Sequence, residues 1–405
     1  PGAGSPVSAA GFPGRTTGRS AGGMVLNGKP MARAAQPPRR IEERLAQGGG
    51  WVEALWLPAL AFGALARARA ALYDRRLLPI ARVPAPVVSV GNLSAGGTGK
   101  TPTTLWLARW LEQRGRRPGV LSRGHGGRAL RRAEAELGLS VERSDEGRLV
   151  ALRAPGLPYH EDPDRVRGAR ALIDQGADVI LLDDGFQHRR LARDLDLVLI
   201  DATRPFGLPW RERSERPPVA LLPRGLLREP PAALARASAL LLTRCDQVPA
   251  GRLEQLADEL LHQAPAAAQV RTRHAPRWLL DGAGGRHDLE RLRGREVELV
   301  SGIGNPRAFE ASVASLGAAI AAHRVFPDHH AYRPADLAGL GSAGRLVLTT
   351  EKDLVKLGAH LPAAMALSIE LELLSGGEVL AALLEALPPS AAEFRRRHLH
   401  EGLHG

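Results

Sequence analysis

The stretch Ser94–Pro102 reads SAGGTGKTP and follows an apolar run, Val87–Val90, directly upstream of a helical pattern, KTPTTLWLARWLEQRG. In a phosphate-binding loop, glycines let consecutive backbone N–H groups face phosphate oxygens, and the start of the next helix adds positive potential. A lysine then reaches the β and γ phosphates, and a Ser or Thr hydroxyl binds Mg²⁺. The stretch therefore predicts a nucleoside triphosphate site with these roles at Gly96, Gly97, Gly99, Lys100 and Thr101.

One position departs from the common form of this loop. The pattern G-x-x-x-x-G-K-[ST] has glycine where Ser94 stands, so a glycine-rich turn with an accidental Lys-Thr is the alternative. Pro102 is compatible with the first turn of a helix. We expect the whole loop to contact the nucleotide, through Ser94, Ala95, Gly96, Gly97, Thr98, Gly99, Lys100 and Thr101.

The composition is that of a globular protein with a preference for phosphates. The 405 residues are 44% hydrophobic and 24% charged, enough for about two domains at roughly 150 residues each. The only cysteine, Cys245, excludes a disulfide framework and a cysteine-based zinc site. A net charge of +12 attracts phosphates on nucleic acid, lipid or a small substrate, but only 4% aromatic residues leave few stacking platforms, so we expect no nucleic-acid partner.

The segment before the loop divides into two parts. Residues 1–49 are rich in Gly, Pro, Ala and Arg without hydrophobic period and are expected to be disordered, with Met24 or Met31 as the natural start. Residues 50–80 predict an apolar helix followed by Arg67, Arg69, Arg75 and Arg76. Its uncharged run is shorter than the ~20 residues that span a bilayer, so it either lies in an anionic membrane interface or is a core helix with a basic end.

From Pro86 onward, short apolar runs alternate with helical patterns. This predicts an α/β fold, a P-loop NTPase-like, mainly parallel sheet flanked by helices, with its ligands beyond the carboxyl ends of the strands. We expect a kinase core at 81–270, a polar linker at 271–296, a smaller α/β domain at 297–388 and a tail at 389–405, with the site between the two domains. The expected strands of the core are Val87–Val90, Gly119–Ser122, Val179–Leu182, Leu197–Ile200 and Ala239–Leu242.

Three further patterns bear on the site. The strand in ADVILLDDGFQHRR ends in Asp183 and Asp184, where an NTPase places a Mg²⁺ or water-positioning acid, although two aspartates can also cap a turn. In LLLTRCDQ, Thr243 and Asp246 have the spacing of a base-recognition motif or simply form a strand-end turn. The basic run between Phe206 and Leu221 predicts a flexible excursion.

Seven motifs in this order resemble the tetraacyldisaccharide 4′-kinases, the lipid A 4′-kinases of Gram-negative bacteria. They are SVGNLSAGGTGKTP, LSRGHGG, DVILLDDGFQHRRLARDLDLVLIDA, LLPRGLLREP, SGIGNPRAF, FPDHHAY and TTEKD. That family also carries a hydroxyl residue at the Ser94 position. The resemblance implies ATP and Mg²⁺ as cofactors, a tetraacylated glucosamine disaccharide 1-phosphate as lipid substrate, and attachment to the cytoplasmic face of the inner membrane. No motif specifies a protein partner.

The resemblance also assigns residues. Asp145 in RSDEGRL and His329 in FPDHHAY match an Asp–His pair that activates the sugar hydroxyl, although Ser144 and Gly147 differ from the family's flanking Gly and Pro. His330 stands next to His329, so the choice of ring stays open, and Asp328 could orient either. The remaining assignments are Arg228 beside the phosphates, Glu229 beside the metal, and Asp183, Asp184 and His188 in the DDGFQH run.

Two other function classes remain at this stage. A ParA/MinD-like membrane ATPase has a similar loop, KGGxGKT, but needs a lysine where Ala95 stands. A non-enzymatic nucleotide-binding module would leave the two aspartates and the His–His pair without a role.

Overall fold

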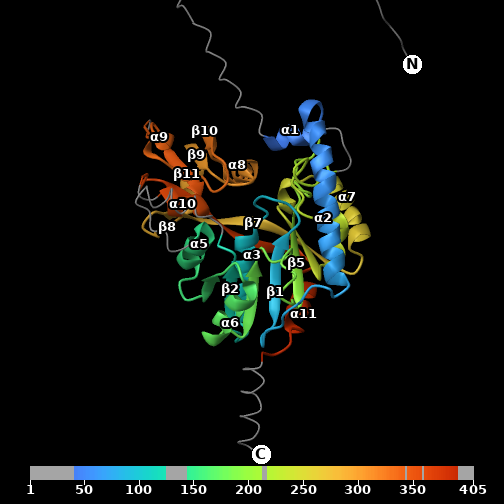
Figure 1. Cartoon of the computed structure of the whole chain (residues 1–405). Helices are drawn as coiled ribbons and strands as arrows, with labels where there is room; N and C mark the ends of the chain where they lie inside the picture. Colours follow the sequence, from blue (N-terminus) through green and yellow to red (C-terminus); the bar gives the residue numbers. More distant parts are fainter. Residues whose placement is uncertain (1–40, 125–143, 212–216, 343, 358–359, 391–405) are drawn as a thin grey trace, which may run out of the picture. The chain divides into compact units, whose positions relative to one another are not determined.

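The structure, a computed structural model, describes residues 41–124, 144–211, 217–342, 344–357 and 360–390 (Figure 1). Its helices are α1 (Ile41–Gln47), α2 (Trp56–Asp74), α3 (Lys100–Glu112), α5 (Asp145–Arg153), α6 (Arg165–Asp174), α7 (Ala250–Gln263), α8 (Pro306–Ser315), α9 (Pro334–Leu337), α10 (Glu351–Leu357) and α11 (Gly377–Glu385). Short 3₁₀ helices are η1 (Gly50–Leu55), η2 (Pro231–Arg236), η3 (Cys245–Gln247) and η4 (Leu289–Leu292). The strands are β1 (Val87–Asn92), β2 (Pro118–Ser122), β3 (Tyr159–Glu161), β4 (Val179–Asp183), β5 (Leu195–Asp201), β6 (Ala239–Thr243), β7 (Ala268–Asp281), β8 (Arg286–His287), β9 (Glu296–Ser301), β10 (Ala319–Val325), β11 (Leu346–Thr350) and β12 (Met365–Ser375).

Strand β1, which leads into the SAGGTGKTP loop, lies in the middle of a parallel sheet. It pairs with β4 on one side and with β5 on the other, in the order β6-β5-β1-β4-β2-β3. Every residue of β1 is buried, as expected of a parallel strand covered by helices on both faces. The mainly parallel fold and all five strands expected in the core are confirmed.

The same sheet continues beyond β6 among the described residues. The next strand, β7, pairs in parallel with β6 through its first part and antiparallel with β12 through its longer second part. Beyond β12 the order continues with β11, β9 and β10. Residues 271–281, expected to belong to a linker, thus form most of β7, and five of their side chains are buried: Thr272, His274, Ala275, Leu279 and Leu280. The division into two domains stays a prediction.

The N-terminal boundary differs from the expectation. Residues 41–47, predicted as part of a disordered extension, form α1 because Leu45 and Ala46 pack against Val52 and Leu208. The rest of that extension, residues 1–40, lies outside the described residues, as do 212–216 of the expected excursion and 391–405 of the tail.

Helix α2 presents most of its apolar surface to solvent. Only Ala59, Gly63 and Tyr73 are buried, on the face that meets Leu221 and Arg189. The large side chains Leu57, Leu60 and Leu65 are 77%, 60% and 71% exposed. With η1, the helix runs over Gly50–Asp74 and is long and apolar enough, by length and composition, to cross a membrane. The exposure of these leucines does not support the core-helix alternative, and attachment to a membrane stays a prediction.

Candidate active site

The phosphate loop of this protein depends on glycines with left-handed backbone conformation. Gly96 and Gly99 have φ values of 113° and 95°, which residues other than glycine rarely adopt. Gly99 is the N-cap residue of α3, so the helix begins at Lys100 directly behind the loop. The loop backbone and the positive end of α3 consequently face the same space, which is the arrangement that binds phosphate.

Two cations and one carboxylate meet next to this loop. Lys100 Nζ lies 3.5 Å from Asp184 Oδ1 and 3.4 Å from Asn92 Oδ1. Arg228 donates from Nη1 to both oxygens of Asp184, at 2.9 and 2.8 Å. Asp184 itself has a φ of 52°, an uncommon conformation for a residue other than glycine and one that is enriched at functional sites.

Asp183 supplies a second carboxylate that is available to a cation. The side chain is buried, and its Oδ1 has no hydrogen-bond partner among the described residues. Burial raises the pKa of Asp183 to about 6, with Lys100 opposing and Asp184 adding to the shift. A buried carboxylate oxygen without a partner is what a divalent cation would satisfy.

The donor set fits Mg²⁺. Asp183, Asp184 and Thr101 line one cavity with Lys100, and Mg²⁺ is commonly held by one or two carboxylates together with substrate phosphates. No cluster of three or more His, Cys, Asp or Glu side chains suited to a metal occurs in the described part of the chain. Glu229 is not among the residues that line this cavity, and it pairs with Arg236 at 2.7 Å.

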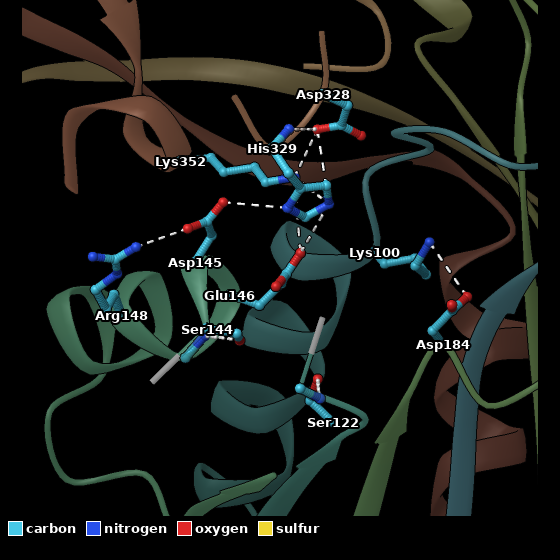
Figure 2. Close-up of polar contacts among 12 residues, drawn as sticks. Lys100, Ser122, Ser144, Asp145, Glu146, Arg148, Asp184, Asp328, His329 and Lys352 are labelled. Atoms are coloured by element: carbon cyan, nitrogen blue, oxygen red, sulfur yellow. Dashed lines mark hydrogen bonds and ion pairs between the residues drawn. The ribbon is translucent and has the colours of Figure 1, made fainter. Parts of the chain in front are cut away.

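Across the cavity, Asp145 meets His329 (Figure 2). Ser144 caps α5 by accepting a hydrogen bond from Gly147 N, and this sets Asp145 in the first turn of the helix. His329 Nδ1 lies 3.2 Å from Asp145 Oδ2, although 184 residues separate them in the chain. The two residues that the family resemblance pairs are therefore in contact.

The charge of Asp145 is held by its partners. Burial raises the pKa of this carboxyl, but the hydrogen bond with His329 and the ammonium groups of Lys356 and Lys352 outweigh burial and leave the pKa well below its usual range. Arg148 Nη2 also donates to it at 2.9 Å. Asp145 is thus a carboxylate at neutral pH, able to orient an imidazole.

His330 points to a different set of partners. Its Nε2 lies 2.9 Å from Asp336 Oδ2, and its ring stacks on Phe326 with centroids 4.6 Å apart. Of the two adjacent histidines, His329 is the one that lines the cavity with the phosphate loop.

Three charged residues of this cluster were not expected from the sequence: Glu146, Lys352 and Lys356. Lys352 Nζ lies 2.9 Å from Asp328 Oδ1, 3.2 Å from His329 Nε2 and 3.8 Å from Glu146 Oε1. Lys356 lies one turn further along α10 and contacts Asp145 at 3.5 Å. The available signal was TTEKD, whose lysine follows the carboxyl end of β11 at the edge where parallel strands place ligands.

A second, mainly apolar cavity adjoins the phosphate loop, with a volume of about 180 Å³. Thr243 Oγ1 donates to Thr98 O, and Arg244 donates to Gly97 O, so the strand-end turn after β6 supports the loop. Asp246 is exposed and does not line this cavity. Ser94 and Ala95 line a small separate hollow. The apolar cavity is lined, among others, by Gly97, Gly99, Arg244, His274, Ile303, Phe309, Leu367 and Ile369.

Comparison with known proteins gives the family. Residues 51–388 match the model of the tetraacyldisaccharide-1-P 4′-kinase family. The chain belongs to this family. It is 44% identical over 365 residues to the tetraacyldisaccharide 4′-kinase of Anaeromyxobacter sp. (strain K), covering 84% of this chain and 92% of that protein. The kinase of the same name from Syntrophus aciditrophicus is 41% identical over 325 residues, covering 74% and 83%.

A solved structure agrees with this assignment. The crystal structure of LpxK from Aquifex aeolicus in complex with ATP is 29% identical in sequence, matches 83% of this chain and 99% of its own, and superposes with a TM-score of 0.64. The expected family, fold class and kinase activity with ATP are thereby confirmed. Membership in a kinase family decides against the ParA/MinD-like ATPase and the non-enzymatic module.

Proposed function

We propose that this protein transfers the γ-phosphoryl group of ATP to the 4′-hydroxyl of a tetraacylated glucosamine disaccharide 1-phosphate at the cytoplasmic face of the inner membrane. The observation that carries the proposal is that His329, in contact with Asp145, lines the same cavity as the phosphate loop and Asp184. A sugar hydroxyl is a weak nucleophile, so a kinase that uses one needs a proton acceptor facing the phosphate site.

The nucleotide side of the reaction falls to the loop and α3. The backbone N–H groups of Gly96–Thr101 bind the phosphates, and Lys100 reaches the β and γ oxygens. Asp183, Asp184 and Thr101 would hold Mg²⁺, which would neutralise negative charge on the transferring phosphoryl group. Arg228 holds Asp184 in place and adds a second cation at the phosphates.

The acceptor side falls to the Asp145–His329 pair. His329 Nε2 takes the proton of the attacking hydroxyl, while Asp145 keeps the ring oriented and stabilises the cation that forms. Positioning and electrostatics then supply most of the rate, as in other phosphoryl transfers.

A cationic cavity of about 500 Å³ supports a phosphorylated sugar as the acceptor. The cavity is lined by Asp184 and Arg228 of the active site and by Arg69 of α2, so it lies between the active site and that helix. Arginine is well suited to bind a phosphate in a bidentate manner. The basic lining residues are Arg69, Arg123, Arg165, His188 and Arg228.

The exposed apolar side chains of α2 support the membrane as the place of reaction. Leucine and tryptophan side chains lie next to arginines on this helix, a composition that binds an interface rich in anionic lipid. An enzyme bound there meets a substrate whose acyl chains stay in the bilayer.

A radiolabelled-ATP assay with and without the lipid disaccharide tests the proposal. The expected result is phosphate transfer to lipid that depends on the acceptor and on Mg²⁺. Hydrolysis at the same rate without lipid, or no turnover with the lipid present, would contradict it.

A further inference from the structure

The hydrogen bonds around His329 fix the position of its ring proton (Figure 2). Lys352 Nζ lies 3.2 Å from Nε2, and an ammonium group can donate but never accept. Nε2 must therefore carry a lone pair, and the ring proton sits on Nδ1, where it is donated to Asp145. The other groups near Nε2, Glu146 and Asp328, are 3.8 and 3.9 Å away, beyond hydrogen-bond distance.

Lys352 remains charged in this position. Burial lowers the pKa of its ammonium group, but the carboxylates of Asp328, Glu146 and Asp145 outweigh burial and raise the pKa above its usual value. Asp328 accepts its shortest hydrogen bond, at 2.9 Å. A permanently charged donor thus covers the one ring atom that could accept a proton from a substrate.

Lys352 also faces the space where phosphates would lie. It lines the cavity of the phosphate loop together with Lys100, Thr101 and Asp183, and it lines the adjoining apolar cavity as well. A lysine ammonium sits on a flexible stem and can change partners without movement of the backbone. A γ-phosphoryl group carries more negative charge than the single carboxylate of Asp328, so it competes for the same cation.

We propose that Lys352 is a positioning residue with two placements, one that covers His329 Nε2 and one on the γ-phosphoryl oxygens of the nucleotide. In the first placement it holds the ring in the tautomer with the proton on Nδ1. In the second it leaves Nε2 free for the acceptor hydroxyl. The base is then uncovered only when the phosphoryl donor is in place. This inference rests on the proposed role of His329, but its test does not need the lipid acceptor.

The first placement is tested by chemical modification of the full-length protein without nucleotide. Diethyl pyrocarbonate acylates a neutral imidazole at its free nitrogen, and peptide mapping by mass spectrometry follows each histidine separately. In Lys352→Met, His329 is expected to react at least about tenfold faster, a change that corresponds to about 1.4 kcal/mol. The exposed His262 serves as internal reference, and Arg293→Met, an exposed cation 76% accessible, as the control variant.

The second placement is tested by calorimetric titration with ATP and ADP in the presence of Mg²⁺. Lys352→Met is expected to lose at least about tenfold in affinity for ATP and much less for ADP, because only ATP carries the γ-phosphoryl group. Lys352→Gln, which keeps a polar side chain and removes the charge, is expected to behave in the same way and serves if the methionine variant does not fold.

Each result decides one part. An unchanged acylation rate of His329 in both variants overturns the covering of Nε2, whatever their activity. Equal losses for ATP and ADP, or none, overturn the second placement. If both expected results are obtained but no lipid is phosphorylated by the unsubstituted protein, the proposed function fails and the two placements of Lys352 stand.

Discussion

At the scale of single residues, Lys100 has the most direct role toward the nucleotide. Its ammonium is held 3.5 Å from Asp184 at the start of α3, so it needs no rearrangement of the backbone to reach the phosphates. Lys100→Ala removes a cation that stabilises the transferring phosphoryl group, and kcat is expected to fall by at least ~10²-fold. Near-normal turnover with an unchanged circular dichroism spectrum would show that the loop is not catalytic.

His188 makes the stability of the fold depend on pH. Burial, with Arg165 and Arg193 nearby, lowers the pKa of this histidine to about 4. Between pH 4 and about 6.5 the unfolded chain therefore binds a proton that the folded chain does not, so stability rises with pH through this window and is lost on acidification.

The measurement for His188 is the melting temperature at pH 7 and at pH 4.5. His188→Gln cannot titrate, so its melting temperature is expected to fall less between these two pH values than that of the unsubstituted protein. An equal fall in both proteins would assign the acid sensitivity to other groups.

Residues of the acceptor side could be found from the sequence only through the family resemblance. Asp145 and His329 are far apart in the chain, and neither belongs to a local pattern that specifies a proton acceptor. Lys352 was missed because its role comes from contacts with Asp328 and His329, which the sequence does not bring together.

At the scale of elements, apolar runs followed by small or polar residues predicted strands β1, β2, β4, β5 and β6. These runs could be assigned because parallel strands are buried on both faces and so lack alternation. Strand β7 could not be assigned in the same way, because its second part carries arginines on the faces that pair with glutamates of β12, such as Arg273 with Glu372. The charged residues of this stretch are also typical of a polar linker, which is why it was expected to be one.

The turn into α3 depends on Gly99. Its φ is 95°, and a Cβ placed there would approach His274 Nε2 to 2.4 Å. Gly115, after α3, has a φ of 74° with open space around it and therefore carries only the backbone strain. An alanine with a left-handed backbone costs roughly 1–2 kcal/mol at either position. At Gly99 the close contact with His274 adds an overpacking cost of about 1–3 kcal/mol.

Urea unfolding of Gly99→Ala and Gly115→Ala separates the two costs. Gly99→Ala is expected to lose at least about 1 kcal/mol more free energy of unfolding than Gly115→Ala. Equal losses would mean that the loop does not press against His274.

At the scale of the whole molecule, α2 links the active site to a surface. Arg69 of α2 donates to Gln187 O in the DDGFQH run, and Arg189, which follows that run, donates to Ala70 O of α2. The helix also exposes leucines to solvent. Leu57→Ser is expected to weaken binding to vesicles that contain anionic lipid by roughly tenfold, since burial of a leucine contributes about 1.5–3 kcal/mol.

Leu261 on α7 is the matched control for α2. It is 50% exposed, and Leu261→Ser is expected to leave vesicle binding unchanged in the same co-flotation assay. Equal effects of the two substitutions would show that α2 is not the membrane-binding element.

The central claim is that Asp145 and His329 act as one proton-accepting unit facing the phosphate loop, and a double-mutant cycle on lipid-dependent phosphate transfer tests it most directly. Asp145→Asn and His329→Gln should each lose roughly 10²–10⁴-fold while they still bind ATP, and the double variant should lose little more than the worse single variant. His330→Ala, whose ring faces Asp336 and Phe326, should keep near-normal transfer. Losses that multiply in the double variant, or a loss in His330→Ala with normal transfer in His329→Gln, would contradict the account.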